Sequence, residues 1–259
     1  MNIVYRIDKS DTFESAIPAT VVDFSDSESF SYTFWNNRNK LPYWYSLQSL
    51  DLLYISMAVF AADRLCLRDN AMDSWSRDFT IFMPVLECDL WLNAKPVLEE
   101  MLGFLSGDNW SFVFRERNES KNEKEQFRKW TKSKRPVKDY DQLCMFSGGL
   151  DSFIGAINLL EQNAGKTLFI SHYGGGKGTK EFQDALKEKF IENYSLESRD
   201  FHQYYAKVVA GIEDTTRTRS FMFFSHALAV TSCLRKPIPL IIPENGFISL
   251  NIPSTFSRI

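Results

Sequence analysis

The chain has 259 residues, of which 44% are hydrophobic and 24% charged, so it is long and apolar enough to bury a large core. Its formal net charge of −3 provides no overall attraction to nucleic acid or to an anionic membrane. The N-terminus lacks the apolar segment of a signal peptide, and the longest apolar stretch, 53–62, is too short to span a bilayer. A reducing, cytoplasmic location is expected, with the four scattered cysteines as free thiols.

Residues 1–117 are expected to form an α+β domain with a core of its own, because many of the aromatic side chains fall there. Alternating and helical hydrophobic spacings distinguish its strands from its helices. The predicted elements are strands over 4–7, 19–24, 30–35, 78–85 and 109–117 and helices over 46–67 and 89–105.

The next segment, 118–139, is dense in charges of both signs and is expected to be a linker between two domains. A solvated linker or an exposed helix is the favoured interpretation. The excess of lysine and arginine, interleaved with Phe127 and Trp130, leaves contact with a polyanion as the alternative.

In residues 140–259 short strands alternate with helices, which predicts an α/β domain built on a parallel sheet. Ligands of such sheets bind at the carboxyl ends of the strands. The predicted elements are strands over 143–146 and 166–173, within 202–209 and over 239–242, and helices over 152–160, 180–190 and 220–234.

The most informative motif, SGGLDS, begins at Ser147 and follows the first of these strands. Gly148 and Gly149 let the backbone turn and approach a ligand closely, and the helix that follows offers unsatisfied N–H groups to an anion. The hydroxyls of Ser147 and Ser152 can donate to phosphate oxygens. Asp151 would repel phosphates unless a cation intervenes, so Asp151 is expected to hold Mg²⁺.

The alternative interpretation of this motif is structural, with Asp151 or Ser152 capping a helix after a glycine turn. A chance match to S-G-G-x-D-S is rare in a chain of this length, and its position between a strand and a helix favours function. The Walker pattern G-x-x-x-x-G-K-[ST] does not occur in the sequence. The motif, including Leu150, therefore predicts binding of a magnesium nucleotide.

SGGLDS resembles the PP-loop of the ATP-pyrophosphatase superfamily, and the resemblance extends from Tyr140 to the C-terminus. HYGGG, into which the second strand runs, Arg219-Ser220 at a helix start and PENG near the C-terminus are similar to features of 7-cyano-7-deazaguanine synthases. The N-terminal extension makes the chain similar to the larger, Qat-type synthase-like proteins of bacterial anti-phage gene clusters. The resemblance implies a Rossmann-like fold and ATP-dependent adenylation of a carboxylate-bearing substrate, with a 7-deazaguanine as the expected class, release of pyrophosphate and formation of an amide or nitrile.

Asp151 and Arg219 are the expected catalytic residues. Arg219, at a helix N-terminus, could reach an ATP phosphate and stabilise the charge that develops at the α-phosphorus, and a surface arginine is the alternative. The acceptor, ammonia or a protein amine, stays open. Transfer of sulfur to tRNA would require a reactive cysteine beside the loop, and Cys144 lies inside the predicted strand.

Four further residues are expected near the nucleotide. Glu244 and Asn245 follow the last predicted strand and could hold the substrate, a purine edge or Mg²⁺, although Asn-Gly is also a common turn. His172 and Tyr173 end the second strand, where the nucleotide base is expected, and packing is the alternative role.

The chain departs from the housekeeping synthases at its C-terminus. Those enzymes carry a zinc-binding cysteine cluster there, whereas no cysteine follows Cys233 in this sequence. Either this relative dispenses with zinc or the sequence is C-terminally incomplete, and both possibilities bear on turnover. The alternative function is therefore a nucleotide-binding subunit of a multiprotein complex that has lost catalysis. The expected partners are a small-molecule substrate and such protein subunits, not a membrane or a nucleic acid.

Overall fold

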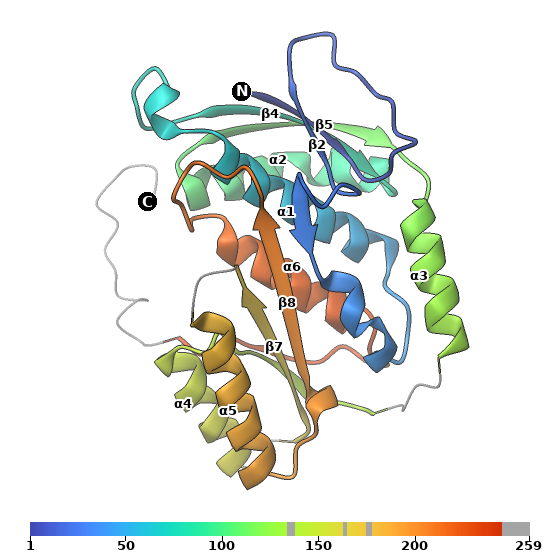
Figure 1. The fold of residues 1–259 in the computed structure, drawn as a ribbon, viewed down its shortest axis with the longest axis vertical. Helices are drawn as coiled ribbons and strands as arrows, with labels where there is room; N and C mark the ends of the chain where they lie inside the picture. Colours follow the sequence, from blue (N-terminus) through green and yellow to red (C-terminus); the bar gives the residue numbers. More distant parts are fainter. Residues whose placement is uncertain (134–137, 163–164, 175–177, 245–259) are drawn as a thin grey trace.

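The computed structural model describes residues 1–133, 138–162, 165–174 and 178–244 and shows an α/β protein with two sheets (Figure 1). The α/β class expected from the sequence is confirmed. In the described part of the chain, no helix is both long and apolar enough to cross a membrane.

The first sheet has the strand order β2-β1-β4-β5 and is parallel throughout. The sequence predicts an α+β unit here, whereas the strands pair in parallel. For β4 and β5 this is possible because α2 carries the chain from the end of β4 back to the start of β5. Trp91 on α2 contacts Phe114 on β5, with ring centroids 6.1 Å apart. The elements are β1 (Asn2–Arg6), β2 (Thr20–Asp23), α1 (Leu47–Leu65), β4 (Asp78–Val85), α2 (Cys88–Ser106) and β5 (Asn109–Glu116).

The second sheet has the order β3-β8-β7-β6-β9, in which only β3 is antiparallel to its neighbour. The four strands of the C-terminal half are thus wound from β6 outward to β7 and β8 on one side and to β9 on the other. The strand order reverses between β6 and β9, which is the position where open α/β sheets bind ligands. The strands are β3 (Phe30–Tyr32), β6 (Gln142–Met145), β7 (Thr167–Tyr173), β8 (Phe201–Val208) and β9 (Leu240–Ile241).

Helices cover both faces of the second sheet. α4 (Leu150–Glu161) and α5 (Thr179–Asn193) lie on one face, and α6 (Arg219–Thr231) lies on the other, beside α1 (Figure 1). One cluster of buried hydrophobic side chains joins the first sheet, α1, α6 and the second sheet, while a smaller one lies under α4 and α5. The central position of α1 explains why it is buried on nearly all sides.

Packing does not follow the predicted division at residue 117. β3 belongs to the N-terminal half but pairs with β8 of the C-terminal half, with Phe30 opposite Val208. Because the larger hydrophobic cluster also includes residues from both halves, the two predicted units share one core.

The charged segment contains a helix, α3 (Lys121–Lys132), that starts with a capping box between Ser120 and Glu123. Its two aromatic side chains pack against Trp44, with centroids 5.3 Å away for Phe127 and 5.6 Å away for Trp130. The spacing of these aromatics is therefore explained by packing, and the exposed-helix interpretation describes this part of the chain better than a polyanion contact.

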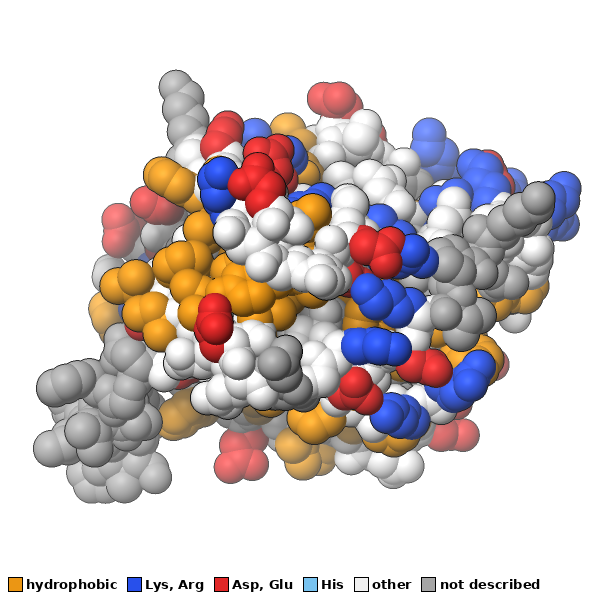
Figure 2. Space-filling view, turned by 90° about the horizontal axis from the view of Figure 1, so that it is seen from below, with side chains coloured by type: hydrophobic (Ala, Val, Ile, Leu, Met, Phe, Trp, Pro, Cys, Tyr) orange, Lys and Arg blue, Asp and Glu red, His pale blue; other side chains and the backbone are white. Residues whose placement is uncertain are grey.

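Seen from below, where α4 and α5 lie in Figure 1, hydrophobic side chains gather on the surface (Figure 2). A groove between the two helices is lined by Phe153, Ile157, Phe190 and Tyr194, among others. Around the start of α4 and of α5, Leu150 and Phe182 are among the most exposed large hydrophobic side chains.

Candidate functional site

The SGGLDS segment forms a tight turn between β6 and α4. Gly148 has a φ of +87°, a left-handed conformation that favours glycine. A Cβ atom at Gly148 would also lie 3.0 Å from Cγ of Gln183 on α5. Gly149 differs, because its φ is −83° and an added Cβ would meet only Oγ of Ser147, at 3.5 Å. The fold therefore requires glycine at Gly148, whereas at Gly149 the missing side chain leaves the backbone accessible to a ligand.

Ser152 holds this turn together. Its buried hydroxyl donates to the Gly149 carbonyl oxygen at 2.8 Å and accepts the Gly148 N–H at 3.1 Å. The Ser147 hydroxyl donates to the same oxygen of Ser152 at 3.1 Å and accepts the Gly149 N–H at 3.3 Å. The structure therefore uses the Ser152 hydroxyl inside the loop, which corrects its expected role as a phosphate donor, while Ser147 is exposed at the turn.

The N-terminus of α4 has no side-chain cap among the described residues. The N-cap is Gly149, and Asp151 and Ser152 lie within the first turn of the helix, so neither of them is the N-cap residue, although Ser152 has a structural role in the turn. Leu150 is 70% exposed and Asp151 is half-buried. An uncapped helix N-terminus beside a glycine turn suits an anion, because its N–H groups and the helix dipole both favour negative charge.

The segment after β9 lies against the same helix. A Cβ atom on Gly155 would stand 2.5 Å from Cβ of Pro243, so the glycine is what allows α4 and this segment to touch. Glu244 follows and is exposed. Because β6 and β9 are neighbours, the SGGLDS turn and Glu244 follow the two strands that flank the reversal of strand order. Asn245 lies outside the described residues.

The end of β7 is tied to the SGGLDS turn by Gln183. Its side-chain amide donates to the carbonyl oxygens of Ser147, at 2.9 Å, and His172, at 3.2 Å. The His172 ring is fully buried, and its centroid lies 5.8 Å from that of His226 on α6. Tyr173 is half-buried and packs on Tyr205 at 5.3 Å. The His172 ring thus faces α6 and the Tyr173 ring lies against Tyr205 on β8, and no contact of either ring with the SGGLDS turn is found among the described residues.

Arg219 begins α6, as the sequence analysis expects, and lines a cavity of about 410 Å³. His172 lines the same cavity, together with Arg64 from the end of α1 and Lys207 from β8. Burial lowers the pKa of Arg219, although an arginine stays charged at neutral pH. The structure therefore brings Arg219 and His172 together in one cavity, and no residue of the SGGLDS turn is among those that line it.

We compared the chain with family models, curated proteins and solved structures, and none of them matches it. The interpretation of the site therefore depends on its own geometry. Among the described residues, no three His, Cys, Asp or Glu side chains gather as a metal site. Mg²⁺ held between one carboxylate and the phosphates of a nucleotide requires no such cluster.

Three residues of this region, Arg64, Gln183 and Lys207, have no signal in the sequence. Gln183 is a buried polar residue next to the exposed Phe182, the reverse of the order that hydrophobicity predicts for an amphipathic helix. Arg64 belongs to the N-terminal half, and only the tertiary packing of α1 beside α6 brings it to this edge of the second sheet.

Proposed function

We propose that the SGGLDS turn and the N-terminus of α4 bind the phosphates of ATP. The observation that carries this proposal is a helix N-terminus that no side chain of the described residues caps, behind a glycine turn, at the carboxyl end of a central parallel strand and beside the reversal of strand order. Gly149 supports it further, because the described residues give no conformational or steric reason for a glycine at that position. Phosphates commonly bind at this combination of turn and helix N-terminus.

Asp151 fits a role as a ligand of Mg²⁺. It is a half-buried carboxylate in the first turn of α4, where phosphates alone would be repelled by its charge. When bound, Mg²⁺ would neutralise phosphate charge and so make Asp151 and the nucleotide compatible. Glu244, exposed on the segment that packs against α4, could take part in holding the ion or the substrate.

The reaction we propose is adenylation of a carboxylate-bearing substrate, with a 7-deazaguanine as the substrate class, followed by amide or nitrile formation. In this reaction a carboxylate oxygen attacks the α-phosphorus of ATP, the bond to the β,γ-phosphates breaks, and pyrophosphate leaves with its electron pair. Ammonia or a protein amine then attacks the acyl carbon, and AMP leaves to give the amide. A nitrile requires ammonia as the acceptor and a second ATP, which adenylates the amide oxygen so that this oxygen leaves with AMP. Arg219 would stabilise the negative charge on the phosphates only where the triphosphate extends from the turn into the cavity that Arg219 lines, because no residue of the turn lines that cavity. The substrate class, and a role in phage defence, are supported only by the resemblance of SGGLDS, Arg219-Ser220 and PENG to the synthases.

The binding step is tested by titrating ATP into the full chain with and without Mg²⁺. With Mg²⁺, we expect saturable binding that weakens about ten-fold in Asp151→Asn, whereas without Mg²⁺ we expect the variant to bind ATP more tightly than the parent chain, because the repelling charge is gone. Asp141→Asn is the matched control, because Asp141 is an exposed aspartate just ahead of β6, at the opposite end of that strand. Folded protein that takes up no ATP, or an Asp151 variant that binds as the parent chain does, would contradict the proposal.

A second candidate function is nucleotide binding without turnover, as a subunit of a larger complex. The exposed hydrophobic side chains of Leu150 and Phe182, 70% and 67% accessible, favour it because they surround the start of α4 and α5. Pyrophosphate release with ATP, a carboxyl-bearing 7-deazaguanine and ammonia distinguishes the two functions. An enzyme releases pyrophosphate over many turnovers, whereas a binding subunit only saturates with ATP.

A further inference from the structure

The cavity that contains Arg219 is built from both halves of the chain. Its walls come from the end of α1, the ends of β7 and β8, the loop after β8 and the first residue of α6. Its volume is about 410 Å³. The residues that distinguish it chemically are the three cations Arg64, Lys207 and Arg219, the imidazole of His172 and the hydroxyls of Thr215 and Thr216.

The cavity has a strong excess of positive charge. Arg64, Lys207 and Arg219 all line it, and none of its described lining residues is an aspartate or a glutamate. The nearest carboxylates in sequence are Asp63, Glu213 and Asp214, and none of them is among the lining residues. Asp63 accepts from Thr215 and Thr218, Glu213 accepts the Arg68 backbone N–H at 3.1 Å, and Asp214 is exposed. Three cations at close quarters repel one another, so an anion placed between them would be stabilised.

Two of these cations have no partner in the described part of the chain. The side chains of Lys207 and Arg219 make no hydrogen bond or ion pair with any described residue, and Arg219 is half-buried. Arg64 is held in place, because its Nη1 donates to the Thr215 carbonyl oxygen at 2.8 Å and its own carbonyl accepts from Ile212 and Glu213. A half-buried arginine without a counter-ion costs free energy that a bound anion would offset.

His172 provides a second, independent indication of a ligand. The ring is fully buried and lines the cavity, yet neither ring nitrogen has a hydrogen-bond partner among the described residues. Burial, and the neighbouring His226 and Arg219, hold the pKa of His172 well below its ordinary value, so the ring is neutral with one N–H to donate. A buried N–H donor is rarely left unpaired in a folded protein, and an oxyanion in the cavity could accept its hydrogen bond.

The charge count selects the class of anion. One carboxylate would neutralise only one of three positive charges, whereas a phosphate or pyrophosphate group carries two or more negative charges and several acceptor oxygens. The start of α6 adds to this field, since the helix has 13 residues and no side chain caps it among the described residues. The hydroxyl of Thr216 supplies a neutral donor, whereas that of Thr215 already donates to Asp63.

We propose that this cavity binds a phosphate or pyrophosphate group between Arg64, Lys207 and Arg219, as an anion site distinct from the SGGLDS turn. The site requires both halves of the chain, because Arg64 comes from α1 and the other two cations from β8 and α6. It does not depend on nucleotide binding at the turn.

The test is titration of inorganic pyrophosphate into the full chain without Mg²⁺, a condition in which Asp151 disfavours phosphate at the turn. We expect one saturable site that Lys207→Gln weakens about ten-fold or more, with Arg64→Gln acting in the same direction. Lys166→Gln is the matched control, because Lys166 is an exposed lysine just ahead of β7, at the amino-terminal end of that strand and away from the cavity. Lys207 is exposed and has no side-chain partner among the described residues, so its variant keeps the test decisive if Arg64→Gln fails to fold.

The outcomes separate this proposal from the proposed function. Loss of Mg-ATP binding in Asp151→Asn with unchanged pyrophosphate binding supports two sites. Displacement of pyrophosphate by Mg-ATP would identify the triphosphate of the nucleotide as the source of the phosphate group, and simultaneous binding would identify a separate ligand. The proposal is overturned if pyrophosphate does not bind, or if the Lys207 and Arg64 variants bind it as tightly as the parent chain.

Discussion

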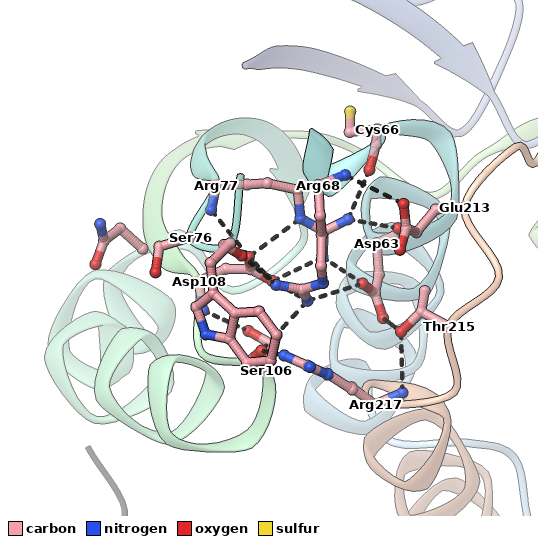
Figure 3. A network of polar contacts seen from close by, with 12 residues as sticks. Asp63, Cys66, Arg68, Ser76, Arg77, Ser106, Asp108, Glu213, Thr215 and Arg217 are labelled. Atoms are coloured by element: carbon pink, nitrogen blue, oxygen red, sulfur yellow. Dashed lines mark hydrogen bonds and ion pairs between the residues drawn. The ribbon is translucent and has the colours of Figure 1, made fainter. Parts of the chain in front are cut away.

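The carboxylate of Asp63, near the end of α1, accepts a hydrogen bond of 2.9 Å from the hydroxyl of Thr218, the residue that precedes α6. The same carboxylate oxygen accepts from the Thr215 hydroxyl at 3.2 Å, and the other oxygen accepts from Arg77. Figure 3 shows Asp63 with Arg77 and Thr215 in this polar network. The contacts of Asp63 with Thr215 and Thr218 attach the segment ahead of Arg219 to the N-terminal half. The position of Arg219 at the cavity therefore depends on residues far from it in sequence.

The centre of this network consists of two carboxylates and two guanidinium groups, and it predicts a large effect of single substitutions. Burial alone would raise the pKa of Asp108, but hydrogen bonds and charge from Arg77 and Arg68 outweigh burial and lower it. Arg77 donates to both Asp63 and Asp108. Arg77→Gln leaves these buried carboxylates short of positive charge, so we expect the free energy of unfolding in urea to fall by about 3–5 kcal/mol.

An exposed arginine serves as the control for this prediction. Arg235 lies 3.9 Å from Asp139, and both side chains are more than half exposed. Arg235→Gln should change the free energy of unfolding by less than about 0.5 kcal/mol. Equal effects of the Arg77 and Arg235 variants would show that the buried network does not stabilise the fold.

Hydrophobic spacing predicts most helices and strands, because in each of them the spacing of apolar residues recurs over many positions. The predicted helix over 46–67 is α1, and the strand predicted over 78–85 coincides with β4. The strand predicted over 30–35 is shorter, because the chain enters a 3₁₀ helix at Phe34. The SGGLDS turn was located by glycine chemistry, which is local and therefore readable from sequence.

The pairing of distant segments could not be predicted in the same way. β3 has only three residues, too few for a recognisable period, and it pairs with β8 across more than 170 positions of sequence. The sequence predicts that the Ser152 hydroxyl donates to phosphates, and only the geometry of the turn shows this hydroxyl bonded to Gly148 and Gly149. Arg64 joins the cavity through the packing of α1 against α6, which no single segment encodes.

Substitution by alanine should have different effects at the two glycines of the turn: it should lower stability at Gly148 and weaken ATP binding at Gly149. Gly148→Ala places a side chain at φ +87° and against Gln183, so we expect it to lower the free energy of unfolding by about 1–3 kcal/mol. Gly149→Ala meets neither obstacle and should leave stability within about 1 kcal/mol of the parent chain. If ligand phosphates approach this backbone, Gly149→Ala weakens ATP binding about ten-fold.

Urea unfolding and ATP titration of both variants check this prediction. If Gly149→Ala is stable and binds ATP as tightly as the parent chain, the proposal that phosphates closely approach the Gly149 backbone is contradicted. A Gly148→Ala variant as stable as the parent chain would contradict the steric explanation of the turn.

The side chain of Gln183 connects the turn after β6 to the end of β7, so its removal should lower the free energy of unfolding. Gln183→Met keeps most of the side-chain volume but removes the donor to the carbonyl oxygens of Ser147 and His172. We expect the free energy of unfolding to fall by about 1–3 kcal/mol, because buried acceptors lose their hydrogen bonds. Gln162→Met, at an exposed position after α4, is the control and should change it by less than about 0.5 kcal/mol. Similar values for both glutamines would contradict the assigned role.

The buried histidines predict that stability falls in mild acid. Burial lowers the pKa of His226 to about 4 and that of His202 to about 3, below the ordinary value of about 6.5. Nδ1 of His226 lies 2.7 Å from the carbonyl oxygen of Met222, an acceptor, so the neutral ring carries its proton there and Nε2 has no partner among the described residues. A second proton would therefore place a charge on a buried nitrogen.

Because the unfolded chain binds these protons more readily than the folded one, the stability contributed by neutral histidine is complete above about pH 6.5 and is lost as the pH falls toward 4. For His226 alone the loss between pH 7.5 and pH 5 is about 2 kcal/mol. Urea unfolding of the parent chain and of His226→Asn at both pH values measures it, since asparagine does not titrate. We expect the variant to be less stable at pH 7.5 but to lose about 2 kcal/mol less on acidification, and an identical loss in both proteins would mean that His226 does not govern the acid response.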